Sequence, residues 1–142
     1  MNVKSILKSK GTAVETIRPD ATLGAAIDAL ALKRIGVLVV SEDGETIRGI
    51  ISERDIVTGL AKHGACLLDL PVASMMTQTV KTCSPSDMIT DVMEIMTNRR
   101  IRHVPVMNNE KLCGIVSIGD AVKHRLWELE TEASHLRDYI AH

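Results

Sequence analysis

A short pattern that occurs twice constrains this chain more than any other feature of its sequence. Residues 49–55 read Gly-Ile-Ile-Ser-Glu-Arg-Asp, and residues 114–120 read Gly-Ile-Val-Ser-Ile-Gly-Asp. Alignment of residues 14–57 with residues 80–122, allowing one gap, adds the identical pairs Val14/Val80, Thr16/Thr82, Pro19/Pro85, Arg34/Arg100, Ile35/Ile101, Val40/Val106 and Val57/Val122. Such a period indicates a duplicated supersecondary unit that cannot bury its apolar face alone. We therefore expect two copies of one small fold.

Each copy shows the same plan of strand, helix, strand, strand and helix, after a short helical lead-in at Val3–Leu7 or Val72–Met76. Apolar residues at helical spacing predict one buried helix face in each copy: Leu23, Ala26, Ile27 and Leu30, then Ile89, Val92, Met93 and Met96. The expected strands cover residues 13–17, 37–40, 46–51, 80–83, 104–107 and 111–116, with hairpin turns at 41–44 and 108–109. The continuous Val and Ile runs predict strands covered on both faces, and Pro105 predicts an edge strand because it has no N–H.

The predicted fold class is α/β (α+β), with tandem β-α-β-β-α repeats packed sheet to sheet about a pseudo-twofold axis. We expect repeat 1 over residues 1–68, repeat 2 over residues 69–128 and a helical extension over residues 129–142. In the long C-terminal helix, apolar residues follow the a/d spacing of a coiled coil: Val122, Leu126, Leu129, Ala133, Leu136 and Ile140. That seam needs a partner surface, either the body of the protein or a second subunit.

Composition argues against several classes of function. The net charge is −1 without a strongly basic run, and the chain has one Trp, one Tyr and no Phe, so neither a DNA-binding surface nor a stacking platform for single strands is expected. Three cysteines without a C-x-x-C pair predict reduced thiols in a cytoplasmic protein, with no disulfide framework. No apolar run spans a bilayer, the spacing of His63, His124, His135 and His142 predicts no metal site, and no catalytic motif is present.

The duplicated strings resemble the Gly-hydrophobic-x-Ser-x-x-Asp signature of tandem CBS (cystathionine β-synthase type) domains, and Val104-Pro105-Val106 is similar to the hydrophobic-Pro-Val strand of that family. The resemblance covers almost the whole chain from Val3. It implies a non-catalytic regulatory module that binds adenosine-containing ligands in clefts between paired repeats. AMP is the first choice, and ADP, ATP, NAD(H) and S-adenosylmethionine are the others. The resemblance, together with the C-terminal seam, also favours a homodimer, and a target protein is expected whose identity the sequence does not give.

Two interpretations apply to the Ser-x-x-Asp motifs. Ser and Asp three residues apart at a helix start predict a capping box that stabilises the helix by roughly 1 kcal/mol. The resemblance implies instead that Asp120 accepts hydrogen bonds from ribose hydroxyls while Ser117 reaches the sugar or the phosphate. Ser52 and Asp55 either do the same or only cap a helix.

Arg99, Arg100, Arg102 and His103 form the densest cationic cluster, which is either a solvated helix end or a phosphate-binding site. Arg102 and His103 are the preferred phosphate contacts, and the resemblance implies that the backbone near Ile101 and His103 meets the adenine edge. Arg54 either reaches a phosphate or pairs on the surface. Thr12, Thr77 and Gln78 are the candidates for closing over the base, with an ordinary loop as the alternative. The first repeat has Gly36-Val37-Leu38-Val39 where the second has Arg102-His103-Val104-Pro105, so the two clefts are not expected to be equivalent.

The leading hypothesis is therefore a sensor of adenine nucleotides without catalysis. The alternative is an oligomeric scaffold or partner-binding subunit whose nucleotide clefts are vestigial. An enzyme is a distant third, because the candidate residues include no activated nucleophile.

Overall fold

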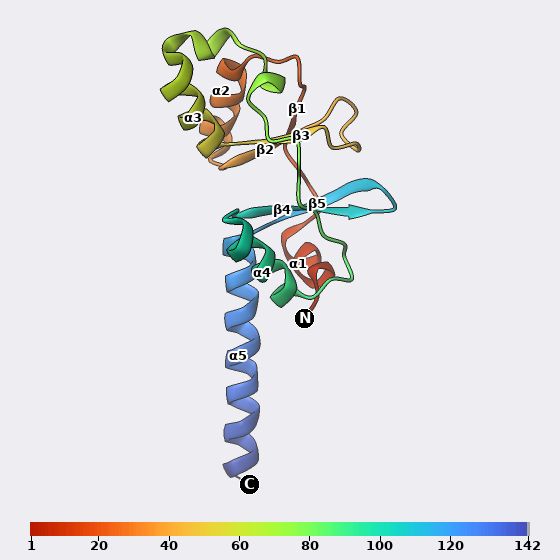
Figure 1. Ribbon diagram of the computed structural model, residues 1–142. Helices are drawn as coiled ribbons and strands as arrows, with labels where there is room; N and C mark the ends of the chain where they lie inside the picture. Colours follow the sequence, from red (N-terminus) through yellow and green to blue (C-terminus); the bar gives the residue numbers. More distant parts are fainter. Residues whose placement is uncertain (142) are drawn as a thin grey trace. The chain divides into compact units, whose positions relative to one another are not determined.

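The computed structural model describes residues 1–141 and shows a mixed α and β fold with small sheets and a long C-terminal helix (Figure 1). The chain divides into two compact units. Unit 1 contains Met1–Thr12, Thr82–Met107 and the chain from Gly114 onward, and unit 2 contains Ala13–Lys81 and Asn108–Cys113. Each unit contains one of the duplicated Ser-x-x-Asp motifs, so each is described by itself.

Unit 2 is built on a three-stranded sheet of order β1-β2-β3, formed by Thr16–Ile17, Val37–Val40 and Gly49–Ser52. Strand β1 runs parallel to β2, and β2 runs antiparallel to β3. Helices α2 (Leu23–Lys33) and α3 (Glu53–His63) follow β1 and β3. The first and third predicted strands of this repeat are longer than those observed, because residues 13–15 and 46–48 lie outside the regular ladders.

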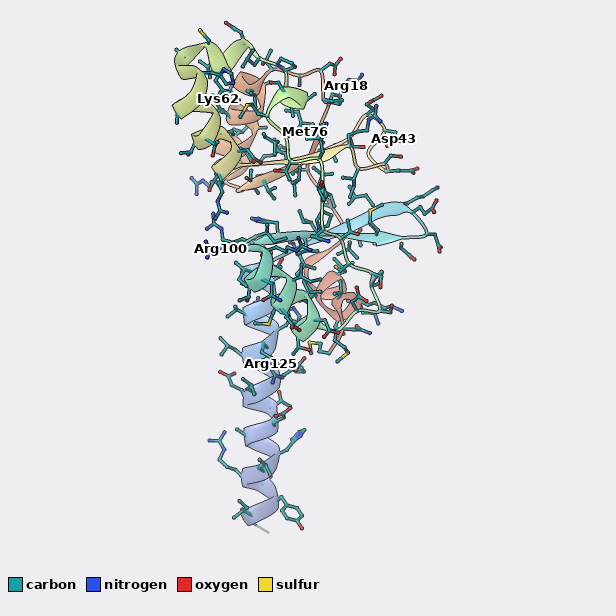
Figure 2. All side chains as sticks on the ribbon, in the orientation of Figure 1. Arg18, Asp43, Lys62, Met76, Arg100 and Arg125 are labelled. Atoms are coloured by element: carbon teal, nitrogen blue, oxygen red, sulfur yellow. The ribbon has the colours of Figure 1, made fainter. Side chains whose placement is uncertain are left out.

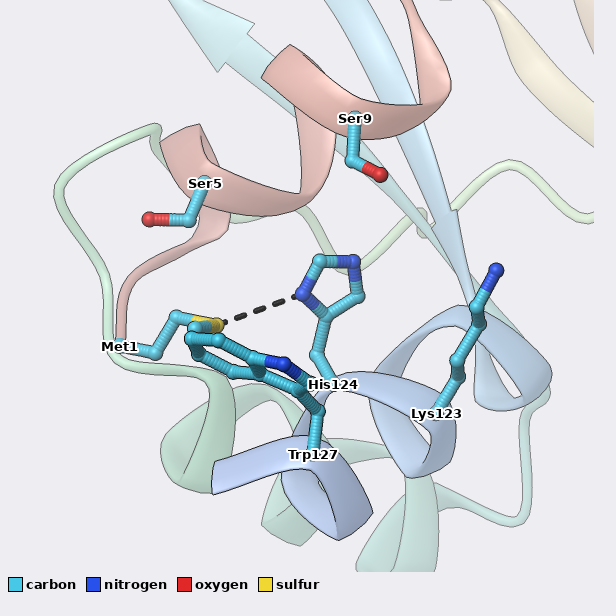
Figure 3. Close-up of a pocket in the computed structure, with 6 residues that line it drawn as sticks. All are labelled: Met1, Ser5, Ser9, Lys123, His124 and Trp127. Carbon is cyan, nitrogen blue, oxygen red and sulfur yellow. Dashed lines mark hydrogen bonds between the residues drawn. The ribbon is translucent and has the colours of Figure 1, made fainter. Parts of the chain in front are cut away.

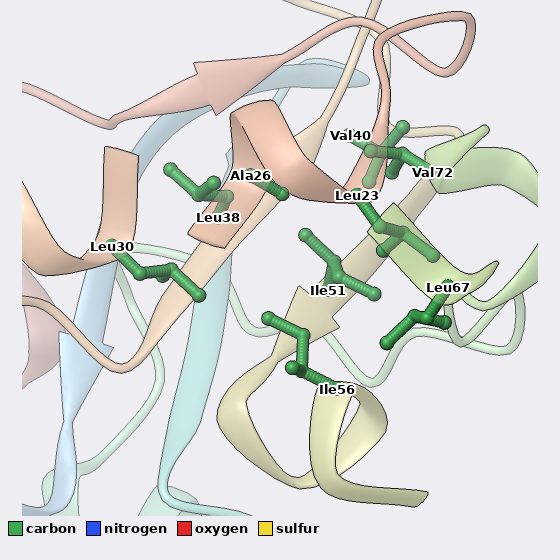
Figure 4. Close-up of a cluster of buried hydrophobic side chains, with 9 residues drawn as sticks. All are labelled: Leu23, Ala26, Leu30, Leu38, Val40, Ile51, Ile56, Leu67 and Val72. Carbon is green, nitrogen blue, oxygen red and sulfur yellow. The ribbon is translucent and has the colours of Figure 1, made fainter. Parts of the chain in front are cut away.

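The apolar pattern of the sequence explains the core of unit 2. All four residues of β2 are buried, as the run of Val and Leu predicts for a strand covered on both faces. The buried cluster in Figure 4 joins side chains from α-helices, strands and 3₁₀ helices: Leu23, Ala26, Leu30, Leu38, Val40, Ile51, Ile56, Leu67 and Val72. Leu67 comes from a 3₁₀ helix, Gly64–Asp69.

Unit 1 combines a two-stranded sheet with the remaining helices. Strands β4 (His103–Asn108) and β5 (Lys111–Ser117) form this sheet, and helices α1 (Val3–Lys10), α4 (Ile89–Arg99) and α5 (Ile118–Ala141) belong to the same unit. The predicted strand at 80–83 is reduced to a single parallel bridge between Cys83 and Val106. The Pro105 carbonyl accepts a hydrogen bond from the Cys83 N–H. Because the sheet consists of β4 and β5 alone, β4 is an edge strand, as Pro105 predicts.

The β4–β5 turn is Asn109-Glu110 rather than Asn108-Asn109. Both turn residues have positive φ, 52° and 65°. Positive φ at both central positions is the requirement of a type I′ hairpin turn, which matches the twist of the flanking strands.

The lead-in of each repeat packs in the unit that contains the other repeat's helices. At the start of α1, the N–H groups of Val3 and Lys4 donate to the carbonyls of Asp87 and Pro85, both 2.9 Å. In unit 2, the N–H groups of Val72 and Ala73 donate to the carbonyls of Ala21 and Pro19. The compact units therefore divide the chain differently from the sequence repeats. The repeat boundaries at residues 1–68 and 69–128 stay a prediction from the sequence.

Helix α5 is partly covered over its first turns and exposed beyond them. Ala121 is fully buried, whereas Leu126, Leu129, Leu136 and Ile140 are 55%, 45%, 62% and 80% exposed. The a/d seam predicted from the sequence is therefore not covered by the part of the chain that the structure describes. Over residues 1–141 no helix is long and apolar enough to cross a membrane.

Candidate functional site

The two Ser-x-x-Asp motifs form capping boxes at the starts of α3 and α5. At α5, the Asp120 N–H donates to Ser117 Oγ at 3.1 Å, and the Ser117 N–H donates to Asp120 Oδ2 at 2.9 Å. At α3, Ser52 and Asp55 make the same reciprocal pair, at 3.3 and 2.9 Å. The capping interpretation is confirmed for both motifs. In both motifs the serine N–H donates to Oδ2 of the aspartate, and a second partner either shares that oxygen or takes Oδ1.

In unit 1, the second partner of the motif is a lysine from the lead-in. Lys10 Nζ lies 2.6 Å from Asp120 Oδ2 and donates to the Ile115 carbonyl at 2.9 Å. Burial raises the pKa of Asp120, but the hydrogen bonds from Lys10 and Ser117 outweigh that effect and hold the pKa below its ordinary value. The motif in unit 1 therefore carries an ionised carboxylate paired with an ammonium group.

In unit 2, the corresponding partner is neutral. Thr77 Oγ1 donates to Asp55 Oδ1 at 3.2 Å, and Ser52 Oγ donates to Oδ2 at 3.0 Å. The backbone of Thr77 exchanges hydrogen bonds with that of Ile50, at 2.8 and 2.9 Å. Both oxygens of Asp55 thus already accept hydrogen bonds within unit 2, and a ligand hydroxyl would have to compete for them.

The repeated glycines allow each lead-in to approach its motif. A Cβ built at Gly114 would lie 2.6 Å from Leu7 Cδ2, in α1. At Gly49 it would lie 2.7 Å from Met76 Sδ, labelled in Figure 2, and 2.9 Å from the Thr77 carbonyl oxygen. Such distances are far below normal contact. At Gly49 a Cβ would meet backbone, so glycine is required there, and at Gly114 a Cβ would have to displace the tip of the Leu7 side chain.

Arg102 lies directly beside the motif of unit 1. Its carbonyl accepts a hydrogen bond from the Ile118 N–H at 2.8 Å, and in unit 2 the equivalent bond runs from the Glu53 N–H to the carbonyl of Gly36. The two motifs therefore share this backbone hydrogen bond, and the residue that accepts it is an arginine in unit 1 and a glycine in unit 2. This difference agrees with the expectation that the two repeats are not equivalent.

The other predicted cations lie near the same end of α4. Arg99 is in the last turn of α4, and Arg100 is its C-cap in the left-handed conformation, with φ 54°. Arg99, Arg100 and Arg102 are exposed, and His103 is half-buried at the start of β4 after half-buried Ile101. Arg54 is exposed in the first turn of α3, and Thr12 and Gln78 are exposed in their loops. The contact of these residues with a ligand stays a prediction.

Lys10 is the residue that sequence reasoning missed. It lies 110 positions from Asp120 along the chain, and local periodicity does not relate positions so far apart. The signal for it is its place just after the first lead-in and directly before Gly11-Thr12, as Thr77 directly follows the second lead-in.

Two other hollows lie apart from the Ser-x-x-Asp motifs. One, of ≈ 280 Å³, lies between Met1, Ser5 and Ser9 on one side and Lys123, His124 and Trp127 of α5 on the other (Figure 3). His124 Nδ1 lies 3.3 Å from Met1 Sδ there. The second, of ≈ 260 Å³, is lined by Glu42, Asp43, Thr46 and Arg48. Backbone N–H groups of Thr46 and Glu45 hold the pKa of Asp43 well below its usual range, which marks Asp43 as a turn-forming residue.

The three cysteines differ in their exposure. Cys66 is exposed, Cys83 is buried, and burial raises the pKa of the half-buried Cys113 thiol. Among residues 1–141, no group of His, Cys, Asp and Glu side chains could hold a metal ion. His142, one of the histidines considered in the sequence, lies outside the described residues.

Comparison with known proteins decides the family. The profile of the CBS domain matches residues 3–62 and 72–126, which together include both motifs. The chain belongs to the CBS domain family. It is 32% identical to the mitochondrial CBS domain-containing protein CBSX3 of Arabidopsis thaliana, over 97% of this chain and 71% of that protein. It is also similar to the crystal structure of a CBS-domain containing protein from Agrobacterium tumefaciens, with 42% identity, a TM-score of 0.85, and coverage of 88% of this chain and 99% of the other.

A more distant CBS structure carries ligands. A CBS domain pair crystallised in complex with 5′-methylthioadenosine and S-adenosyl-L-methionine has a TM-score of 0.77 over 92% of this chain and 98% of the other, with 24% sequence identity. At that identity the likeness shows the CBS fold alone. The tandem CBS resemblance and the fold class predicted from the sequence are confirmed by these comparisons.

Proposed function

We propose that this CBS protein is a non-catalytic regulatory module that binds an adenosine-containing ligand at the Ser117–Asp120 motif. The observation that supports this proposal is Asp120 itself, an ionised carboxylate at the start of a 24-residue helix, with Lys10 and the Ser117 N–H both donating to its Oδ2. A carboxylate oxygen so placed can accept a hydrogen bond from a ribose hydroxyl. The adenosine ligands of the distant CBS pair are the kind of molecule that such a site would hold.

AMP is the first choice of ligand because cations gather around this motif. Lys10 contacts Asp120, and Arg102 adjoins Ile118 through its backbone. Arg and Lys side chains bind phosphate through charge-assisted hydrogen bonds. ATP, ADP, NAD(H) and S-adenosylmethionine are the other candidates.

The regulatory step is a population shift. A ligand that binds one conformation of the CBS pair more tightly than another changes their populations by that difference in affinity. The exposed a/d seam of α5 offers the route to a partner, and we propose a homodimer in which two seams cover each other. A cytoplasmic location stays a prediction from the sequence, and the Arabidopsis relative is described as mitochondrial.

Thermal unfolding with and without nucleotide tests the binding site. A ligand at 100 times its dissociation constant stabilises the folded state by about 2.7 kcal/mol, so AMP is expected to raise Tm by several degrees. Asp120→Ala should abolish the rise, whereas Asp91→Ala, on α4 and away from the motif, should keep it. An equal rise in Tm for wild type and Asp120→Ala would show that AMP does not bind at this site.

The alternative is an oligomeric scaffold with vestigial nucleotide sites, favoured by the same exposed face of α5. The two are separated by heating the purified protein and analysing the supernatant for released nucleotide. A scaffold releases none, and it shows no change in Tm with any adenosine ligand.

A further inference from the structure

The two Ser-x-x-Asp motifs differ in the charge of the residue that the lead-in brings to the aspartate. In unit 2 that residue is Thr77, a neutral hydroxyl 3.2 Å from Asp55 Oδ1. In unit 1 it is Lys10, with its ammonium 2.6 Å from Asp120 Oδ2. The reciprocal Ser–Asp capping hydrogen bonds are the same in both units, so the two motifs can be compared by the residue that each aspartate meets.

The donors of Lys10 are not all used by the protein. An ammonium group has three N–H donors, and among the described residues Lys10 uses one for Asp120 Oδ2 and one for the Ile115 carbonyl. The Lys10 side chain is 32% exposed and the Asp120 side chain is 24% exposed. One N–H donor therefore remains for a group that arrives from solvent.

The acceptors of Asp120 are also only half used. Oδ2 accepts from Lys10 and from the Ser117 N–H. Because Lys10 and the Ser117 N–H both donate to Oδ2, Oδ1 is the oxygen at which a ribose hydroxyl can bind without displacing Lys10. The Lys10 ammonium then stays beside the bound sugar. Its hydrogen bonds to Asp120 Oδ2 and to the Ile115 carbonyl fix the direction of its third N–H.

We propose that Lys10 is a specificity-determining residue that makes the Ser117–Asp120 site prefer a phosphorylated adenosine ligand over the neutral nucleoside. This inference rests on the proposed function. The remaining N–H of Lys10 donates to an anionic phosphate oxygen of the ligand, and a neutral nucleoside offers no such acceptor. In unit 2 the aspartate meets the neutral hydroxyl of Thr77, so the motif there lacks this ammonium.

Calorimetric titration of the full chain with AMP and with adenosine tests the proposal. Wild type should bind AMP more tightly than adenosine, and Lys10→Met should reduce the ratio of the two affinities about tenfold, the effect of losing one charge-assisted hydrogen bond. Lys10→Arg keeps the charge and should keep most of the preference. Lys8→Met, an exposed position in the same turn of α1, is the matched control and should leave the ratio unchanged.

The outcomes separate the two proposals. If Lys10→Met weakens AMP and adenosine by the same factor, or leaves both unchanged, Lys10 does not set the preference, although the binding site stands. If wild type binds neither ligand, the proposed function fails and the role of Lys10 fails with it. A thermal melt of each variant shows that a lost preference does not arise from unfolding.

Discussion

Asp55 and Asp120 illustrate how one local chemistry leads to two different environments. Both aspartates cap a helix through the same reciprocal hydrogen bonds with a serine. They differ in the residue that arrives from a distant lead-in, a threonine in one unit and a lysine in the other. The local sequence therefore predicts the cap of each motif, and the long-range contact determines its charge.

The lowered pKa of Asp120 predicts a pH dependence of stability. Because the folded-state pKa lies below the unfolded value of about 3.9, the ionised carboxylate stabilises the fold fully above about pH 4, and this contribution is lost as the pH falls through the folded-state pKa. Asp120→Asn should lower the free energy of unfolding by about 1 kcal/mol at pH 7. The difference from wild type should shrink toward pH 3.

Urea unfolding of wild type and variant between pH 7 and pH 3 measures this dependence. Asp138→Asn, on the exposed end of the same helix, is the control and should follow wild type at every pH. A difference between wild type and Asp120→Asn that stays constant over this range would show that the charge of Asp120 does not contribute.

The two repeated glycines give a matched pair of substitutions. Gly114→Ala brings a methyl group against the tip of the Leu7 side chain. Gly49→Ala brings one against the Met76 side chain and against the Thr77 carbonyl oxygen, at 2.9 Å. Overpacking costs typically about 1–3 kcal/mol, and a backbone group yields less easily than a side chain. We expect both variants to lose stability in urea, with Gly49→Ala losing more. Equal losses, or a gain in either variant, would contradict the close approach of the lead-ins.

At the scale of elements, periodicity predicts most of what is observed. The helix faces with i, i+3, i+4 spacing became α2 and α4. The weakest predictions concern short strands. Residues 80–83 make only one bridge, because a strand of this length depends on its neighbour rather than on its own residues.

The exposed face of α5 predicts self-association. In an antiparallel or parallel pair, the residues of the a/d seam would pack against their equivalents. The double variant Leu129→Lys/Leu136→Lys places two charges in that seam, so it should shift the protein from dimer to monomer in light scattering after gel filtration, with an unchanged circular dichroism spectrum.

A pair of lysines outside the seam is the control. Glu130→Lys/Glu132→Lys, at exposed positions of the same helix, should leave the dimer intact. A wild-type monomer at micromolar concentration, or a dimer that survives the seam variant, would exclude α5 as the interface.

At the scale of the whole molecule, the duplication predicted the repeat architecture and one Ser-x-x-Asp motif in each copy. What it could not predict was the exchange of lead-ins, in which Val3 hydrogen-bonds to Asp87 and Val72 to Ala21. These contacts join positions far apart in sequence, and the residues involved are ordinary helix and turn formers. Lys10 was missed for the same reason, since only the exchange brings it to Asp120.

Isothermal titration calorimetry of the full chain with AMP tests the central claim most directly. Binding at the Ser117–Asp120 motif predicts saturable heat in wild type that is absent in Asp120→Ala while the variant remains folded. Parallel titrations with ATP, NADH and S-adenosylmethionine identify the preferred adenosine ligand. No heat with any of the four ligands in wild type, or undiminished binding in Asp120→Ala, would contradict the account.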